Sequence, residues 1–406
     1  MLFRGEERKQ IMKHVNGNEW KDAAICQHYF EDNSNYYGAV TPPIVQTTLF
    51  TFDTFDAFIE ASNHERENHL YCRGVNPTTE ILEKKLAKLE CGEQAKVFGS
   101  GMGAISATLF TLLEAGDHIL LVNNVYGPAT IYSKTLEKFH VECTNVFVQD
   151  AGEIEQYVKP NTKIIYYESP STQMMYMLDI DTIVDIARRH DILTMTDNTW
   201  STPFYQKPLT HGVDIVIHSC TKYIGGHSDV MAGAVISRHE IVDRIFEIGH
   251  QFSGAAIGPF EAWLLIRGLR SLEARLEHQA RTTQAVVEML KDHPMVKTVN
   301  HPLCFTGKQK ELADRYLTGY TSLLSIDLHT DAFEDVRTVA DACGIFQIGV
   351  SWGGFESLIL PQNHGDNEAY LKEAHIPGGL IRLYLGMEPA EDLVSDLKQA
   401  LDKIMK

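Results

Sequence analysis

The sequence has little positive charge and no long apolar stretch, and each shortage excludes a class of partner. Lysine and arginine total 36 against 54 aspartate and glutamate residues, so the formal net charge is −18. This excess of negative charge argues against nucleic acid or an anionic membrane surface as partner. No apolar run approaches membrane-spanning length, and the start, Met1–Lys9, lacks the apolar core of a signal peptide. We therefore expect a cytoplasmic protein.

Cysteine is also scarce. The seven cysteines lie far apart with no C-x-x-C pair, which indicates neither a zinc site nor a disulfide framework. The histidines, His227 included, show no metal-ligand spacing, so we assign them structural roles and predict no metal. What remains is ordinary for a globular protein, with 44% hydrophobic and 22% charged residues. The 406 residues are enough for two or three domains with substantial cores.

Three regions of the chain differ in pattern. Residues 1–63 are polar and weakly periodic, and Pro42-Pro43 favours an extended arm, which we expect to lie on a neighbouring subunit. Residues 64–254 repeat short apolar runs and helical segments, after a helix that Asn76 can cap and Gly92 can end. Residues 255–406 open with long helices over 259–293 and continue as a smaller mixed domain.

The middle region predicts an α/β fold with a mostly parallel central sheet. Short apolar runs separated by helices are typical of parallel strands that are covered on both faces. The predicted strands are Ala95–Phe98, His118–Val122, Val141–Val148, Thr162–Glu168, Leu193–Asp197, Asp214–His218 and Met231–Ile236. Ligands of such sheets bind beyond the carboxyl ends of the strands. For the smaller α+β C-terminal domain, we predict strands near 322–328 and 381–385 and a helix near 331–342.

Three polar features follow the ends of these strands. Lys222 stands just after the strand ending at His218; a solvated turn lysine is one interpretation, and a desolvated Schiff-base amine is the other. Asp197 ends the preceding strand, where it could cap a turn or pair with a protonated ring nitrogen. The glycine-rich turn Gly99–Gly103 precedes a helix and could bind a phosphate. Together they are the parts that a pyridoxal phosphate site needs.

The same glycine string permits a second interpretation. Residues 99–104 fit the dinucleotide fingerprint G-x-G-x-x-A, so a nucleotide-dependent oxidoreductase stays a distant alternative. That fingerprint calls for an acid after the next strand, where Asn123 and Asn124 stand instead.

Ordered motifs along nearly the whole chain resemble the Cys/Met-metabolism family of pyridoxal-phosphate enzymes. They lie at residues 71–78, 100–102, 168–170, 197–200, 219–229, 267–270, 351–357 and 381–386. The resemblance implies an aspartate-aminotransferase-like fold (PLP fold type I) with pyridoxal 5′-phosphate as cofactor and a small amino acid as substrate. It also implies a homotetramer, built as a dimer of dimers whose active sites are shared between subunits.

The resemblance implies a role for each matching residue. Lys222 is similar to the Schiff-base lysine, Asp197 to the partner of the ring nitrogen, and Tyr126 to a tyrosine that stacks on the ring and assists proton transfer. The expected phosphate ligands are Gly101, Met102, Ser219 and Thr221, with Tyr71 and Arg73 from a neighbouring subunit. On the substrate side, Arg382 is similar to the arginine that binds the α-carboxylate, a task suited to its forked guanidinium. Ser351 and Trp352 are expected near that carboxylate.

The branch of the family depends on fewer residues. Tryptophan at both positions 200 and 352 resembles the β-lyase branch. Val350 stands where γ-acting members often carry glutamate. We therefore predict β-elimination on L-cystathionine, giving homocysteine, pyruvate and ammonia. Residues 71–77 and 201–203 resemble the γ-acting branch, so a cystathionine or methionine γ-lyase and a cystathionine γ-synthase stay alternatives. A binding protein without turnover is a further alternative, against which the intact Lys222, Asp197, Tyr126 and Arg382 argue.

Overall fold

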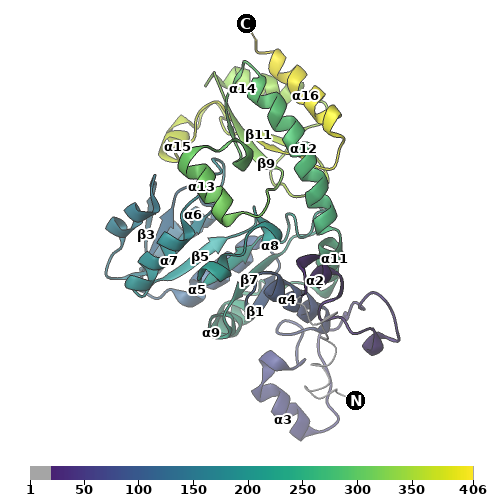
Figure 1. Cartoon of the computed structure of the whole chain (residues 1–406). Coiled ribbons are helices and arrows are strands. Elements are labelled where there is room, and N and C mark those ends of the chain that lie inside the picture. Colours follow the sequence, from purple (N-terminus) through teal and green to yellow (C-terminus); the bar gives the residue numbers. More distant parts are fainter. Residues whose placement is uncertain (1–19, 406) are drawn as a thin grey trace.

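The computed structural model describes residues 20–405 and contains two sheets in succession (Figure 1). The first has seven strands in the order β1-β7-β6-β5-β4-β2-β3. Strands β3, β2, β4, β5 and β6 run parallel, whereas β7 is antiparallel to both β1 and β6. The strands are β1 (Gln94–Phe98), β2 (His118–Val122), β3 (Glu142–Val146), β4 (Thr162–Glu168), β5 (Leu193–Asp197), β6 (Ile215–His218) and β7 (Gly233–Ser237). The predicted mostly parallel α/β sheet is confirmed.

Helices cover both faces of this sheet, as the apolar strands require. Leu121, Tyr166 and Ile217 pack in one core with helices α5 (Gly101–Leu112), α6 (Gly127–Thr135) and α9 (His239–Arg244). On the other face, Leu120, Ile165 and Tyr167 share a core with α7 (Ile180–Arg189) and α13 (Gly307–Tyr316), while α4 (Pro77–Leu89) covers β1. Helix α8 (Thr202–Tyr205) follows β5.

Helix α4 begins as predicted, but the residue that takes the left-handed position after its end is not the predicted one. The Asn76 side chain accepts a hydrogen bond from Thr78 N at 2.8 Å, and Pro77 is the first helical residue. The left-handed position after the helix belongs to Cys91, with φ 60°, rather than to Gly92. Gly92 N donates to Ala87 O at 2.9 Å, and a Cβ on Gly92 would lie 2.4 Å from Ile236 Cγ2. Gly92 is therefore needed for close packing against β7, not for its φ angle.

The second sheet belongs to the C-terminal part of the chain. Its order is β10-β11-β12-β9-β8, formed by β8 (Val296–Asn300), β9 (Leu323–Leu328), β10 (Gln347–Ile348), β11 (Leu358–Pro361) and β12 (Leu380–Tyr384). Helices α12 (Leu272–Asp292), α14 (Phe333–Ala342) and α16 (Ala390–Asp402) share its core, and α15 (Glu368–Glu373) lies beside it. In Figure 1, α12 continues the line of α11 (Pro259–Arg270) from the first sheet up to the second. The limits of the three proposed domains, 1–63, 64–254 and 255–406, stay a prediction.

The N-terminal region contains more helix than we expected. Residues 42–47, which include the double proline, have no regular structure, but α2 (Asp22–His28) and α3 (Phe55–Asn63) lie on either side. Figure 1 shows α3 extending away from both sheets. Residues 1–19 of the predicted arm, with the segment Met1–Lys9, fall outside the described residues. Within residues 20–405, no helix combines the length and the apolar character needed to cross a bilayer.

Candidate active site

Strands β5 and β6 bring the two central residues of the predicted site to one edge of the sheet. Asp197, the last residue of β5, is in register with Ile217 of the parallel neighbour β6. The chain then turns directly after β6, with Lys222 N donating to Ser219 O at 3.1 Å. The site is therefore placed beyond the carboxyl ends of adjacent parallel strands, as predicted.

The Lys222 amine is not a solvated surface group. Its Nζ donates a hydrogen bond to Ser351 Oγ and lies 5.5 Å from the centre of the Trp352 ring. Burial lowers the pKa of Lys222 to about 8, and the Arg382 guanidinium lowers it too, whereas Asp197 opposes them. A lysine with this pKa has an appreciable neutral fraction near pH 7, which a Schiff-base nucleophile requires.

The loop that carries Ser351 and Trp352 lies directly against Lys222. Ser351 has φ 75° and Gly353 has φ 90°, both in the left-handed region. A Cβ on Gly353 would lie 2.6 Å from Lys222 C, so only glycine allows this approach. The second sheet therefore contributes one wall of the site.

Asp197 is held by a short chain of hydrogen bonds that leads to Ser219. Thr199 donates to Asp197 Oδ1 from its backbone N at 2.9 Å and also from its hydroxyl. The same hydroxyl accepts from Ser219 N at 2.8 Å. Burial raises the pKa of Asp197, while the Thr199 hydrogen bonds and the charges of His218 and Lys222 lower it. Thr199 thus fixes the acid relative to the segment after β6.

The start of α5 offers donors to an anion. Ser100 caps the helix by accepting from Gly103 N at 2.9 Å, and its carbonyl accepts from Ala104 N at 3.1 Å. Within residues 20–405, the N–H groups of Gly101 and Met102 have no acceptor. A Cβ on Gly101 would lie 3.0 Å from Ser219 Oγ, so the glycine lets the helix start and Ser219 meet. These two free N–H groups fit a phosphate.

Thr221 has a different environment from the one expected. Its hydroxyl accepts from Ala232 N at 3.0 Å and lies 3.2 Å from Ala232 O, which ties it to the segment before β7. The hydroxyl keeps one lone pair for a further donor, but its own hydrogen already has an acceptor in the chain. Its assignment to the phosphate stays a prediction.

Glu168 is a site residue whose role the sequence analysis did not assign. It ends β4 in register with Asp197, and its Oε1 accepts from Tyr126 N at 2.6 Å. Its Oε2 accepts from Thr172 N at 3.1 Å and from Thr172 Oγ1 at 2.5 Å. Burial and the charge of Asp197 raise the pKa of Glu168. The sequence does contain a signal for this site residue, because Glu168 is an acid at the end of the strand next to β5. Thr172 therefore belongs to the surroundings of the site as the partner of Glu168.

Arg382 brings the second sheet into the site. It lies on β12, its Nη2 donates to Ser351 O at 3.1 Å, and burial lowers its pKa to about 10. Tyr126 acts on the pKa of Arg382 in the opposite direction and raises it. Tyr126 itself is 46% exposed, which leaves its ring accessible to a ligand.

The described chain does not bring every predicted residue to this place. Tyr71 and Arg73 contact each other instead, and Arg73 Nε donates to Gln251 Oε1 at 3.1 Å. Val350 is 78% exposed. Trp200 is buried in the core and donates from Nε1 to Leu323 O at 3.0 Å. Of the three residues used to choose the branch, only Trp352 has a contact with Lys222.

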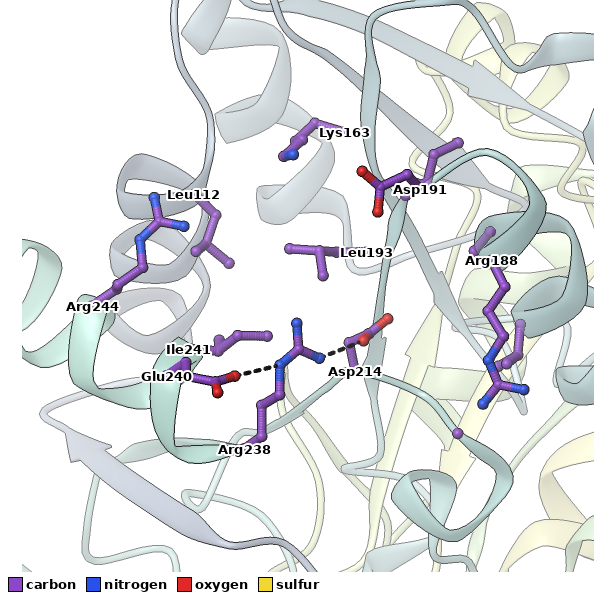
Figure 2. Close-up of a pocket in the computed structure, with 14 residues that line it drawn as sticks. Leu112, Lys163, Arg188, Asp191, Leu193, Asp214, Arg238, Glu240, Ile241 and Arg244 are labelled. Atoms are coloured by element: carbon purple, nitrogen blue, oxygen red, sulfur yellow. Dashed lines mark hydrogen bonds and ion pairs between the residues drawn. The ribbon is translucent and has the colours of Figure 1, made fainter.

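A separate cavity of about 460 Å³ lies at the opposite edge of the first sheet (Figure 2). Lys163, Leu193 and Asp214 line it near the amino ends of β4, β5 and β6, so it contains none of the predicted site residues. In Figure 2, Arg238 pairs with Asp214 at 2.8 Å and with Glu240 at 3.2 Å. Arg188 and Arg244 at its rim are exposed.

Comparison with known proteins decides the family. The family model described as "Cys/Met metabolism PLP-dependent enzyme" matches residues 24–402. The chain belongs to this family. Its cofactor is therefore pyridoxal 5′-phosphate, and the free N–H groups, the low-pKa lysine and the buried acid described above fit that group. The family assignment leaves the dinucleotide alternative without support.

Curated relatives come from more than one branch. An L-methionine gamma-lyase from Fusobacterium nucleatum subsp. nucleatum is 38% identical over 377 residues, covering 91% of this chain and 95% of the relative. A cystathionine beta-lyase, MetC, from Bacillus subtilis is 37% identical, covering 90% and 93%. A cystathionine gamma-lyase from the same organism is 34% identical, covering 90% and 95%.

Solved structures agree with the fold. A putative O-acetylhomoserine (thiol)-lyase from Campylobacter jejuni, which carries a pyridoxyl-lysine monophosphate, is 29% identical with a TM-score of 0.87, covering 94% of this chain and all of that one. The metB protein from Corynebacterium glutamicum is 28% identical with a TM-score of 0.87, covering 96% and 99%. The expected PLP fold type I is confirmed.

Proposed function

We propose that this protein is a carbon–sulfur lyase that carries out β-elimination on L-cystathionine, giving homocysteine, pyruvate and ammonia. The observation that supports it most is the surroundings of the Lys222 amine. Its low pKa, the nearby Arg382 and the indole wall of Trp352 combine a proton acceptor, a carboxylate binder and an apolar contact.

The chain's own groups would hold the cofactor and substrate as follows. Gly101, Met102 and Ser219 would bind the phosphate, helped by Thr221 and by Tyr71 and Arg73 of a neighbouring subunit. Asp197 would keep the ring nitrogen protonated, and Tyr126 would lie on the ring. Bound to Lys222 as a Schiff base, pyridoxal phosphate supplies an electron sink for negative charge at the substrate α-carbon.

The reaction then requires one proton acceptor and one leaving group. Arg382 would hold the substrate α-carboxylate through its fork, with the backbone at Ser351 fixing the guanidinium. The Lys222 amine would take the proton from the substrate α-carbon. The bond between Cβ and sulfur breaks with its electron pair on sulfur, and the thiolate takes up a proton as homocysteine. Hydrolysis of the remaining three-carbon fragment gives pyruvate and ammonia.

Trp352 is the support for the β-lyase branch. Its ring centre lies 5.5 Å from Lys222 Nζ and 5.4 Å from the centre of the Tyr223 ring. An indole at this point gives the substrate side chain an apolar contact and no carboxylate to bind a distal amino group. The absence of a glutamate at position 350 acts in the same direction, although the exposed Val350 does not itself form a wall of the site in this chain.

γ-Elimination is the second candidate, supported by relatives named as methionine and cystathionine gamma-lyases. The products separate the two reactions. We would incubate the holoenzyme with L-cystathionine and, separately, with L-methionine, and identify the oxo acid by mass spectrometry. Pyruvate from cystathionine supports the proposal, and 2-oxobutyrate as the main product of either substrate would replace it by γ-elimination. Lys222→Ala serves as the control for uncatalysed breakdown.

We also propose that the enzyme is a cytoplasmic homotetramer, a dimer of dimers whose sites take Tyr71 and Arg73 from the neighbouring subunit. Both side chains are exposed and contact each other, which supports this arrangement. Light scattering of the purified protein would test the tetramer.

A further inference from the structure

We propose that a buried ion-pair network of Glu83, Lys96 and Arg66 positions the Tyr71–Arg73 segment, and through it sets how tightly a neighbouring subunit binds its cofactor. This inference rests on the proposed role of Tyr71 and Arg73. It assigns a function to three charged residues that take no part in the chemistry described above.

The segment has an exposed tip on a buried base. Tyr71 and Arg73 are exposed, with the Arg73 guanidinium 5.2 Å from the Tyr71 ring centre, whereas Gly74, Val75 and Asn76 are buried. Asn76 Nδ2 donates to Cys72 Sγ at 3.2 Å and to Val45 O at 2.8 Å. The direction of the tip therefore depends on what holds the base.

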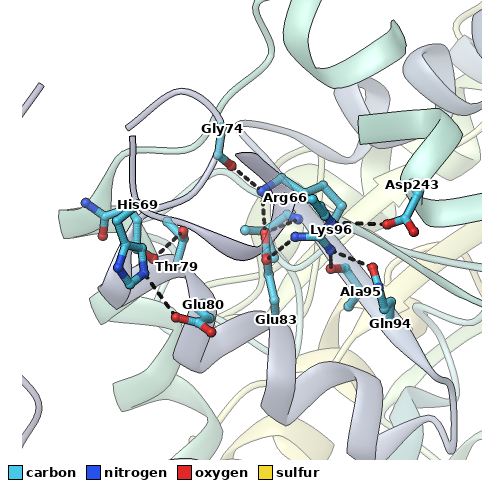
Figure 3. Close-up of polar contacts among 12 residues, drawn as sticks. Arg66, His69, Gly74, Thr79, Glu80, Glu83, Gln94, Ala95, Lys96 and Asp243 are labelled. Carbon is cyan, nitrogen blue, oxygen red and sulfur yellow. Dashed lines mark hydrogen bonds and ion pairs between the residues drawn. The ribbon is translucent and has the colours of Figure 1, made fainter. Parts of the chain in front are cut away.

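Lys96 is the main contact of the base. It lies on β1 and is 1% exposed, and its Nζ donates to Gly74 O at 2.6 Å (Figure 3). The same Nζ lies 2.9 Å from Glu83 Oε1 on α4. Glu83 in turn accepts from Val97 N at 3.3 Å and lies 3.7 Å from Arg66 Nη1. One ammonium thus joins the sheet, helix α4 and the carbonyl that follows Arg73.

Arg66 extends the network to the other side of the segment. It donates to Gln94 Oε1 at 2.8 Å and to Asp243 Oδ1 at 3.4 Å, as Figure 3 shows. Its neighbour Glu65 accepts from Gln251 Nε2 at 2.9 Å, and Gln251 is the residue that holds Arg73. These side chains end close to the Gly74 backbone, since a Cβ on Gly74 would lie 2.7 Å from Glu65 Oε1 and 3.1 Å from Gln251 Nε2.

Stability alone does not account for such a network. Taking a lysine and a glutamate out of water offsets most of their attraction, and apolar replacements of similar size are often as stable. A positional role is different, because the Gly74 carbonyl needs a donor at one particular point. Helix α4, which carries Glu83, also carries a second buried lysine that serves as a matched comparison. Lys85 is equally buried and lies 3.0 Å from Glu31, but it donates to Ile25 O and Cys26 O instead.

The test is a comparison of charge-free variants. Lys96→Met with Glu83→Gln removes the network charges, and Lys85→Met with Glu31→Gln is the matched control. For each we would measure the dissociation constant of pyridoxal phosphate from the apoenzyme by fluorescence titration, alongside oligomeric state and circular dichroism. A misplacement on the scale of an ångström reduces a positioned interaction substantially, so we expect about tenfold weaker binding in the network variant and less than about twofold in the control.

Arg73→Ala, alone and combined with the network variant, distinguishes the possible failures. If the network acts through the segment, the combined variant binds the cofactor no more weakly than Arg73→Ala alone. Unchanged binding in Arg73→Ala would refute the proposed role of the segment. Weakened binding in Arg73→Ala with unchanged binding in the folded network variant would refute the network's role. Should the network variant not fold, Arg66→Gln at the partly exposed edge tests the same point with the same two outcomes.

Discussion

Tyr126 N donates a 2.6 Å hydrogen bond to Glu168 Oε1, which ties the loop after β2 to the end of β4. Glu168 is therefore a positioning residue for the tyrosine expected to lie on the cofactor ring. Because β4 lies beside β5, the charge of Asp197 also raises the pKa of the Glu168 carboxyl group.

Glu168→Leu should lower kcat by about tenfold or more, since a positioned proton-transfer group contributes about 10²–10⁴-fold and the variant loosens it without removing it. We expect the KM for substrate and the cofactor affinity to change much less. Steady-state kinetics and a cofactor titration check this. Thr172→Val, which deletes one of the two Thr172 donors, should show a smaller effect in the same direction. A kcat equal to the wild type in Glu168→Leu would contradict the assignment.

The low pKa of Lys222 predicts how cofactor capture depends on pH. The neutral amine attacks the aldehyde, and this form is in the majority above pH about 8 rather than above 10.5, the value of an ordinary lysine. The rate of Schiff-base formation by the apoenzyme should therefore rise with pH and level off near pH 8. Stopped-flow absorbance at a series of pH values measures it. A rate that keeps rising tenfold per pH unit beyond pH 9 would show that the lysine is not desolvated.

A buried pair behind the site governs stability. His218 Nε2 lies 2.5 Å from Glu90 Oε1, which also accepts from Asn198 Nδ2 at 2.8 Å, and both Glu90 and His218 are at most 1% exposed. Glu90→Leu leaves His218 and Asn198 without this acceptor, so we expect a loss of about 3 kcal/mol in unfolding free energy. Thermal unfolding of the holoenzyme measures it. The double variant Glu90→Leu with His218→Leu should recover most of the lost unfolding free energy. If it does not, the destabilisation comes from altered packing and not from a buried polar group without its partner.

The sequence predicts the first sheet well because its local patterns and its tertiary structure agree. Each strand is a short apolar run that ends in polar residues, and all seven strands lie within two residues of their predicted bounds. The placement of Asp197 and Lys222 at one edge of the sheet followed from the parallel order of β5 and β6. Strands β8, β10 and β11 were not predicted. The exposed Lys297 and Thr298 and the terminal Pro361 weaken the apolar pattern of β8 and β11, and β10 has only two residues, both exposed.

The parts of the site that depend on contacts distant in sequence were harder to predict. Nothing local in Glu168-Ser169-Pro170 shows that the acid caps the Tyr126 loop, since its partners lie on either side in the chain. Trp200 and Val350 are a second case. Their residue types resemble a specificity signal, but no local pattern shows that Trp200 donates to Leu323 O in the core or that Val350 is exposed, so the branch stays a prediction.

The shared site predicts complementation between two inactive variants. Lys222→Ala removes the amine, and Arg73→Ala removes a group that we expect to act in the neighbouring subunit. In a mixed dimer, one site then combines an intact Lys222 with an intact Arg73, while the other site lacks both. Random pairing of equal amounts should therefore restore about a quarter of the wild-type sites in a two-fold symmetric dimer. The measurement is lyase activity after the two variants are unfolded together and refolded with cofactor.

The control for this experiment is a second pair of variants. Lys222→Ala and Asp197→Ala change residues of the same chain's site, so neither site of their mixed dimer is intact and activity should stay absent. Recovery in the first pair but not in the second would place Arg73 in its neighbour's site. Equal absence of activity in both pairs, with mixed dimers demonstrated by mass spectrometry, would place Arg73 in the site of its own chain.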